Sequence, residues 1–147
     1  GAITKSKDTS AVERTQHGTA GVNYKDVTGL GVTVTGAAAA TTLYTIATVS
    51  GSFPTVEVEA TAFEVATPNN CRIFAKRRPF KNIAGTITDG TAIDIHADDD
   101  LGTVWGSPPV LAIVHSGTDI LIQGTPSAND TRFVLKEVRV FACTTGA

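Results

Sequence analysis

The sequence predicts an all-β protein, a two-sheet antiparallel sandwich or jelly roll with an extended N-terminal arm. Threonine and valine are abundant, and both are stiff β-branched residues that suit a half-buried pleated surface. Breaks rich in Gly, Pro and Asn separate the apolar segments at intervals of about ten residues. Only Ala37–Ala40 has a helix-like composition, and it is too short to form a helix of its own.

The chain divides into an arm over residues 1 to 26 and a β-sandwich domain over residues 27 to 147. The arm carries too few apolar side chains to offset the conformational entropy that it loses on ordering. Its order is therefore expected to come from contacts with the surface of its own domain, with a crystal neighbour or with other subunits of an assembly, and the last of these is favoured. The remaining length is enough for one hydrophobic core that needs neither a metal nor a disulfide.

The predicted strands are short runs of β-branched and aromatic residues that end at turn residues. Their number, about ten, and the lack of an amphipathic helix indicate two packed sheets. In chain order they are Val27–Thr35, Leu43–Val49, Thr55–Ala66, Cys71–Lys76, Gly85–Thr88, Ala92–His96, Thr103–Trp105, Val110–His115, Asp119–Gln123 and Phe133–Cys143.

The strand over residues 55 to 66 alternates between inward and outward side chains. Glu57 and Glu59 fall on the outward positions, so they are expected to face water. Phe63 and Val65 then reverse the parity of the apolar residues, which predicts a β-bulge near Ala62. The inward set is Val56, Val58, Ala60 and Ala62.

Two later segments, Val110–Val114 and Ile120–Ile122, are apolar on both faces. This pattern is typical either of a central strand or of a strand whose outer face meets another subunit. The last strand closes the sheet, and its neighbouring charges predict cross-strand ion pairs rather than a site. Its two faces carry Val138, Val140 and Ala142 on one side and Glu137, Arg139 and Phe141 on the other.

Bulk properties exclude several classes of partner. The formal net charge of -2 gives no global field toward nucleic acid or an anionic membrane, so neither is expected as a partner. No apolar run approaches the ~20 residues of a membrane span, and the first residues lack the layout of a secretory leader. We expect a soluble protein.

The two cysteines, Cys71 and Cys143, lie in predicted strands that are far apart in the sequence. Buried free thiols are favoured, and a single disulfide is the alternative. Neither cysteine belongs to a Cys-x-x-Cys or Cys/His cluster, so no zinc site is predicted.

A run of acidic residues follows the strand that begins at residue 92. Closely spaced Asp oxygens suit a hard cation such as calcium, but the run lacks the glycine-punctuated loop of a calcium site. An acidic solvated turn is therefore favoured. The run contains Asp94, His96, Asp98, Asp99 and Asp100.

The sequence contains no recognisable catalytic motif. No catalytic, cofactor-binding or metal-binding residue is therefore assigned, and the protein is not expected to be an enzyme. His115, Ser116 and Asp119 share one tight turn, which does not give the geometry of a triad. Glycoside hydrolysis needs two carboxylates at a separation that the sequence does not give. The carboxylates concerned are Asp89, Asp94 and Asp98–Asp100, and the other histidines are His17 and His96.

The densest positive cluster is Lys76–Lys81, with Phe74 and Phe80 interleaved. Such a patch could bind phosphate or an acidic partner. A solvated strand end is favoured, because charges and a proline such as Pro79 protect sheet edges from unwanted pairing.

Several segments together resemble a β-sandwich module of tailed-bacteriophage virion proteins. The segments are Ala37–Ile46, the strand pair around Glu57 to Val65, Arg77–Thr88, Gly117–Thr125 and the closing Val-rich strand. The resemblance implies a non-enzymatic particle component: a head decoration protein, a head fibre or a tail-fibre domain, commonly trimeric. A short chain with its own arm favours decoration or cementing of a capsid.

The expected mechanism is physical: the sandwich sits on the virion surface, and the arm lies across neighbouring subunits and adds main-chain hydrogen bonds and charge pairs. Expected partners are the major capsid protein or other virion subunits and further copies of the chain, with a trimer favoured. The alternative is a head- or tail-fibre domain that binds host carbohydrate. The arm residues concerned are Lys5, Lys7, Glu13 and Arg14, and the aromatic residues available for sugar stacking are Tyr24, Tyr44 and Trp105.

Overall fold

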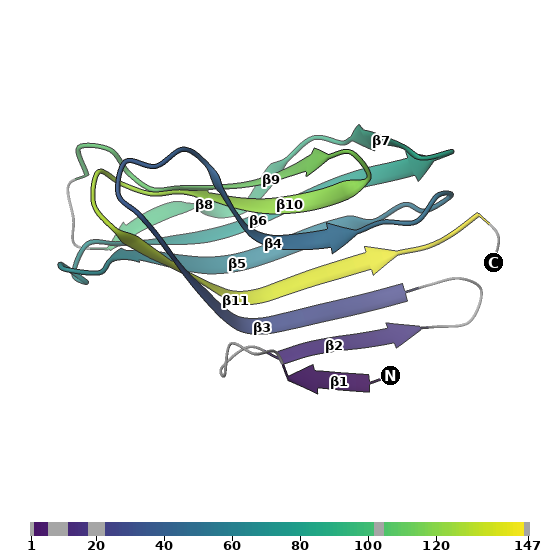
Figure 1. The fold of residues 1–147 in the computed structure, drawn as a ribbon, viewed down its shortest axis with the longest axis horizontal. Coiled ribbons are helices and arrows are strands. Elements are labelled where there is room, and N and C mark those ends of the chain that lie inside the picture. Colours follow the sequence, from purple (N-terminus) through teal and green to yellow (C-terminus); the bar gives the residue numbers. More distant parts are fainter. Residues whose placement is uncertain (1, 6–11, 18–22, 102–104, 146–147) are drawn as a thin grey trace.

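The computed structural model describes residues 2–5, 12–17, 23–101 and 105–145. Over these ranges the secondary structure consists of strands in two antiparallel sheets (Figure 1), which confirms the prediction of an all-β, two-sheet sandwich. No helix in the described ranges is long and apolar enough to cross a membrane.

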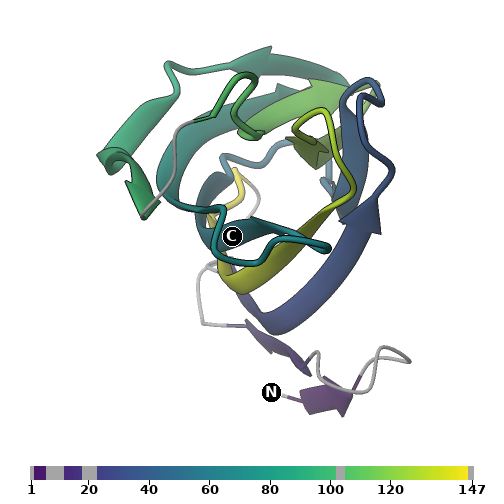
Figure 2. The same ribbon diagram turned by 90° about the vertical axis from the view of Figure 1, so that its left-hand side faces the viewer.

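The larger sheet has eight strands in the order β1-β2-β3-β11-β5-β6-β7, with β8 also paired to β6. The smaller sheet has the order β4-β10-β9. Viewed along its long axis, the sandwich curls around a shared interior, and β1 and β2 project beyond that body (Figure 2). The large-sheet strands are β1 (Ala2–Lys5), β2 (Val12–His17), β3 (Asn23–Val34), β5 (Thr55–Glu64), β6 (Cys71–Ile83), β7 (Thr86–Asp89), β8 (Ile93–Leu101) and β11 (Thr131–Ala142); the others are β4 (Thr41–Ala47), β9 (Val110–Ser116) and β10 (Asp119–Thr125).

The hydrophobic core lies between the two sheets because each strand presents alternate residues to the interior. Phe133 of β11 is fully buried, and a Cβ placed on Gly124 of β10 would lie 2.9 Å from its ring. Glycine at this position therefore lets the sheets approach closely. The predicted inward residues of β5 are all buried, and they pack in a cluster that includes Phe74, Leu111, Ile113, Ile120, Ile122 and Leu135.

The bulge predicted near Ala62 is wrong. Strand β5 keeps one parity to its end, because the inward position after Ala62 is filled by Glu64, which is buried, while Val65 is exposed. A register shift lies instead in the partner strand β11, between Leu135 and Glu137. An acidic residue in a core position caused the error, because the pattern treated every inward residue as apolar.

The outer face of the sheet carries the predicted cross-strand ion pairs. Arg139 of β11 lies 3.5 Å from Glu57 and 3.9 Å from Glu59 of β5, and 2.8 Å from Glu137 of its own strand. In register, Asp26 of β3 is on the other side of Arg139. Charges of alternating sign on adjacent strands favour this pairing register over a slipped one.

The N-terminal segment differs from the extended arm expected to depend on neighbours. Strand β1 pairs with β2, and β2 pairs with β3 of the same chain, so both continue the large sheet. The physical reason is that β3 would otherwise be a free edge, and β2 satisfies its backbone hydrogen bonds.

Strand β6 runs through Pro79, where the sequence predicted a solvated strand end. Strand β8 pairs with residues up to Arg77, and β7 pairs from Phe80 onward, so Pro79 sits at the junction of the two ladders. Its missing N–H therefore breaks no ladder bond, and its carbonyl accepts the Gly90 N–H at 2.7 Å. The predicted strand at Thr103–Trp105 falls partly outside the described residues.

The cysteines are free thiols. Cys71 is half-buried and Cys143 is exposed, so the expectation that both are buried is wrong. Cys71 begins β6 and pairs opposite Phe63, whereas Cys143 follows β11 at the end of the sheet where Thr55 pairs with Phe141. The two thiols thus lie at opposite ends of β5, which precludes a bridge between them.

Candidate functional site

The densest group of charged side chains lies where β6, β7 and β8 of the large sheet approach β9 of the small sheet. We call it the ion-pair strip. Alternate residues of β6 supply its cations, because residues two apart in a strand share a face. Its members are Arg72, Lys76 and Arg78 of β6, Asp89 of β7, and Asp94, Asp98 and Asp100 of β8.

The acidic run predicted as a solvated turn is part of strand β8. Lys76 Nζ lies 2.8 Å from an oxygen of Asp94 and 3.2 Å from one of Asp98, and Arg72 Nε lies 3.1 Å from Asp100. Asp94, Asp98 and Asp100 are thus ion-paired with two cations of β6. Within the described ranges, no group of three or more His, Cys, Asp or Glu side chains could hold a metal ion.

Two arginines of the strip also join the sheets. Arg78 donates from Nε to the Gly90 carbonyl and from Nη1 to the Ile113 carbonyl, each at 2.9 Å. Arg72 Nη1 donates to the Pro109 carbonyl at 3.2 Å. Because β9 is the edge of the small sheet, its outward carbonyls need partners, and the arginines of β6 supply them. Part of the predicted basic cluster therefore stabilises the contact between the two sheets.

The strip places His115 against Asp89 and not against the residues of its own turn. His115 Nδ1 contacts a carboxylate oxygen of Asp89, whose other oxygen lies 3.4 Å from Arg78 Nη2. Ser116 and Asp119 face each other across the β9–β10 turn. The candidate triad of His115, Ser116 and Asp119 is therefore replaced by an Arg78–Asp89–His115 cluster, which orients the imidazole and closes the junction of β7 with β9.

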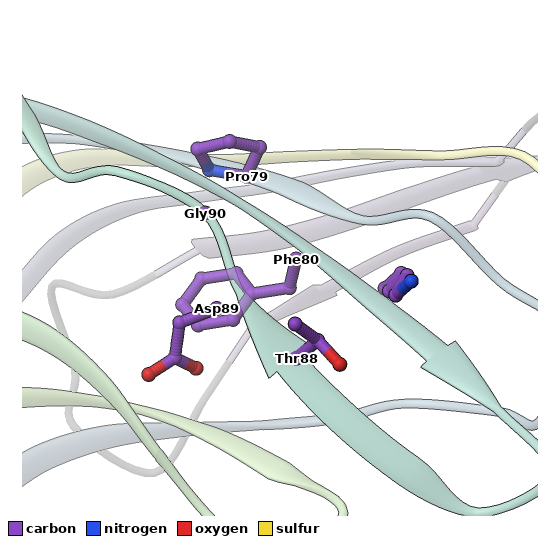
Figure 3. Close-up of a pocket in the computed structure, with 6 residues that line it drawn as sticks. Pro79, Phe80, Thr88, Asp89 and Gly90 are labelled. Carbon is purple, nitrogen blue, oxygen red and sulfur yellow. The ribbon is translucent and has the colours of Figure 1, made fainter.

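A shallow depression of about 240 Å³ lies at the β6–β7 hairpin, next to the ion-pair strip, and Asp89 belongs to both (Figure 3). The rings of Pro79 and Phe80 flank Gly90, and the Asp89 carboxylate points away from the Pro79 ring. Lys81 and Thr88 complete the wall. The depression is therefore lined by apolar ring atoms, the ammonium group of Lys81, the hydroxyl group of Thr88 and the carboxylate residue Asp89.

A second polar site surrounds the buried carboxylate of Glu64. Its Oε2 accepts hydrogen bonds from Ser127 Oγ at 2.8 Å and from Asn129 Nδ2 at 2.6 Å, and its Oε1 accepts one from Asn70. The bond from Asn70, followed by those from Asn129 and Ser127, lowers the pKa of Glu64 against the opposing effect of burial. Glu64 therefore stays ionised and fixes the two loops that supply its donors.

The candidate aromatic residues for sugar stacking do not gather at one place. Tyr44 is half-buried against the core, with Lys25 Nζ 5.3 Å from its ring centre. Trp105 is half-buried, and its Nε1 has no hydrogen-bond partner in the described part of the chain. The side chains of Tyr24, His17 and the arm residues Lys5, Lys7, Glu13 and Arg14 lie outside the described residues.

Sequence reasoning missed the pairing of β6 with β8 and the role of Glu64. The signal for the first was present: basic residues gather between Arg72 and Arg78, and acidic residues are concentrated in Asp94–Asp100. Opposite charges gathered on two successive strands indicate that the strands pair side by side. For Glu64, the signal was its inward parity in a strand whose other inward residues are apolar.

We expect Arg78→Met to lower the free energy of unfolding by about 1–2 kcal/mol, because it leaves the Ile113 and Gly90 carbonyls and the Asp89 carboxylate without their donor. Arg77→Met is the matched control, since Arg77 is exposed on the opposite face of the same strand. Urea unfolding of both variants measures the difference. Equal losses in the two variants would contradict the joining role of Arg78.

Two solved structures resemble the fold. The tailspike protein of Acinetobacter baumannii bacteriophage Fri1, a capsular polysaccharide depolymerase, matches over 91% of this chain and 20% of its own, with 12% identity and a TM-score of 0.48. The tailspike protein of Acinetobacter baumannii phage AM24 matches over 85% of this chain and 26% of its own, with 10% identity and a TM-score of 0.41. The chain thus spans a fifth to about a quarter of these tailspikes. No protein-family model and no curated protein matches it.

Both structures are bacteriophage tailspike proteins, which agrees with the coarse part of the resemblance to β-modules of phage virions. At these identities the likeness concerns the fold alone. The finding corrects the expectation that the protein is not an enzyme, because a chain that contains a similar fold is described as a polysaccharide depolymerase.

Proposed function

We propose that the chain is a β-sandwich module of a bacteriophage virion that is held on the outer surface of the particle by protein contacts. Decoration of the capsid is the placement we favour. The attachment is mechanical: edge strands and exposed apolar side chains of the module add hydrogen bonds and buried area to neighbouring subunits, and repetition over the particle sums many weak contacts.

The observation that supports this proposal is the exposure of β8. All of its residues except Asp98 are exposed, including Ile93, Ile95 and Leu101 with 42%, 49% and 48% of their surface accessible. Large apolar side chains on an exposed strand favour a protein partner, because their burial is worth about 25 cal/mol per Å². Because β2 pairs with β3 of its own chain, we place the attachment surface on the exposed strand edges and not on the N-terminal arm.

A second candidate function is binding of a host carbohydrate. The depression beside Pro79 and Phe80 supports it, because apolar ring atoms can contact the C–H face of a sugar while the Lys81 ammonium and Thr88 hydroxyl groups can bind its hydroxyl groups. We expect this candidate to show as binding on a glycan array that is lost in Lys81→Ala. An array without signal for the unchanged protein would remove it.

The proposal of a virion component predicts that the chain is present in gradient-purified particles of the phage that encodes it. Antibodies raised against the purified protein should decorate these particles in electron microscopy, and mass spectrometry should find the chain in the same fraction. Antibody label on the head shell would support capsid decoration, and label on the tail would indicate that the module belongs to a tail fibre. Absence from purified particles would overturn the proposal.

A further inference from the structure

We propose that the outer face of β6 binds a saccharide chain that carries carboxylate groups, with Arg77 and Lys81 as its two cationic contacts. This inference rests on the second candidate function, carbohydrate binding, and it names the chemical class of the ligand. It starts from the basic cluster Lys76–Lys81, because the ion-pair strip uses only part of that cluster.

The pleat of β6 divides the basic cluster between two faces, since successive side chains of a strand point to opposite sides. Lys76 and Arg78 lie on the face of the ion-pair strip, where both are bound to carboxylates. Arg77, Pro79 and Lys81 alternate with them and are exposed. Two cations of the cluster are therefore structural, and the other two face solvent.

The two outward cations keep their charge available for a ligand. Within the described part of the chain, neither Arg77 nor Lys81 forms an ion pair or a side-chain hydrogen bond. Glu57 of β5 is in register with Arg77, but its carboxylate lies 3.5 Å from Arg139. The carboxylate of Asp89, which lines the same depression as Lys81, is bound within the ion-pair strip. An anionic ligand can therefore approach without displacing an existing ion pair.

The two cations line neighbouring depressions. Lys81 belongs to the depression of about 240 Å³ described above, and Arg77 belongs to a second one of about 500 Å³. Pro79 lines both, and the successive residues Gly90 and Thr91 line the first and the second, so the depressions meet at Pro79. In an extended strand the Cα atoms of Arg77 and Lys81 are about 13 Å apart. A ligand that contacts both cations is therefore an extended chain and not a single small ion.

The surface between the cations offers contacts that suit sugar units. The Pro79 ring and the side chain of Ile93, which has 42% of its surface accessible, can pack against C–H faces. The hydroxyl groups of Thr55, Thr88 and Thr91 can exchange hydrogen bonds with sugar hydroxyl groups, because each is both a donor and an acceptor. These apolar and hydroxyl groups favour a saccharide as the body of the ligand.

The cations select an acidic ligand. The guanidinium group of Arg77 matches a carboxylate through two parallel hydrogen bonds, and the Lys81 ammonium group adds a point charge. An acidic peptide is disfavoured, because an extended peptide gains main-chain hydrogen bonds at a free strand edge. Strand β6 has β5 on one side and β7 and β8 on the other, so it offers no such edge here.

The test measures binding of three soluble probes to the full-length protein by equilibrium titration. Oligogalacturonate carries a carboxylate on each sugar unit, its methyl ester keeps the sugars without the charge, and oligoglutamate keeps the charge without the sugars. Arg77→Met, Lys81→Met and the double variant remove the cations. Lys136→Met is the matched control, because Lys136 is an exposed lysine of β11 that lines neither depression.

We expect oligogalacturonate to bind the unchanged protein and Lys136→Met with the same dissociation constant. Arg77→Met and Lys81→Met should each raise this constant by about two- to five-fold, the range of one exposed ion contact, and the double variant should raise it by about ten-fold. Added salt should weaken binding, because exposed charges are screened. The methyl ester should bind at least about ten-fold more weakly than the acid, as loss of both ion contacts implies.

Equal binding of the acid and the ester would overturn the inference and leave carbohydrate binding as a candidate function. Oligoglutamate that binds as tightly as oligogalacturonate would overturn it in favour of an acidic protein partner. An equal loss in Lys136→Met would mean unspecific charge attraction, and no binding of oligogalacturonate at millimolar concentration would also refute the assignment. The candidate function itself fails separately, on a glycan array without signal.

Discussion

Replacing Phe133 by alanine is expected to lower the free energy of unfolding by about 3–5 kcal/mol. The ring is fully buried at the centre of the large sheet, and it reaches the small sheet at Gly124 of β10. The substitution removes apolar contacts from both sheets at once and leaves a cavity, because a close-packed β-sandwich cannot collapse around the lost volume. Denaturant unfolding followed by fluorescence of Trp105 or by circular dichroism measures the loss.

Val134→Ala is the control for this prediction. Val134 follows Phe133 in β11 and points to the outer face, where it is only half-buried. Its truncation should cost about 1 kcal/mol or less. A Phe133→Ala variant that lost no more stability than Val134→Ala would mean that the two sheets do not pack through this ring.

Glu64→Gln is expected to lower the free energy of unfolding at neutral pH by about 2–3 kcal/mol. The carboxylate accepts hydrogen bonds from three donors, on Asn70, Ser127 and Asn129. An amide in its place has only one oxygen, and its NH₂ group meets donors, so at least one buried bond is lost. Glu59→Gln is the control, because Glu59 lies on the same strand with its side chain exposed and 3.9 Å from Arg139.

The same carboxylate predicts the acid dependence of stability. Hydrogen bonds lower the pKa of Glu64 in the folded state, so the stability that they contribute is present above its ordinary value of 4.5 and is lost as the pH falls through the lower folded value. Thermal unfolding between pH 6 and about 2 should show this loss, and Glu64→Gln should reduce its slope. An unchanged slope in the variant would assign the acid sensitivity to other carboxylates.

Local pattern predicted most strands because strand propensity and turn residues act over a few positions. The parity of Val56 to Ala62, the outward charges of β11 and the paired residues around Arg139 follow from the period of two alone. The same reasoning failed at Glu64 and Pro79. A carboxylate in the core and a proline within a strand are both unfavourable by local rules. Glu64 is tolerated because side chains of distant loops donate hydrogen bonds to it, and Pro79 is tolerated because it lies between the β6–β8 and β6–β7 ladders.

The candidate site was the least predictable part. The sequence placed His115 with Ser116 and Asp119, since they are neighbours in the chain, whereas the folded chain brings Asp89 and Arg78 to the imidazole from two other strands. The acidic run of β8 was interpreted as a turn because its partners are more than a dozen residues away along the chain. Composition gives the charges of such groups, and only strand pairing decides which of them meet.

The sequence by itself determined that this protein is built of β-strands, which faces of the central strands are apolar, and that its surface carries mixed charge with little net excess. Those properties are local or summed over the chain, so they do not depend on the path of the backbone. The tertiary structure alone decided that the N-terminal segment joins its own sheet, that β8 remains an exposed edge, and that β6 arginines close the sandwich against β9. These outcomes depend on which edges find partners, because backbone hydrogen bonds and buried charges must be satisfied between segments that are distant in sequence.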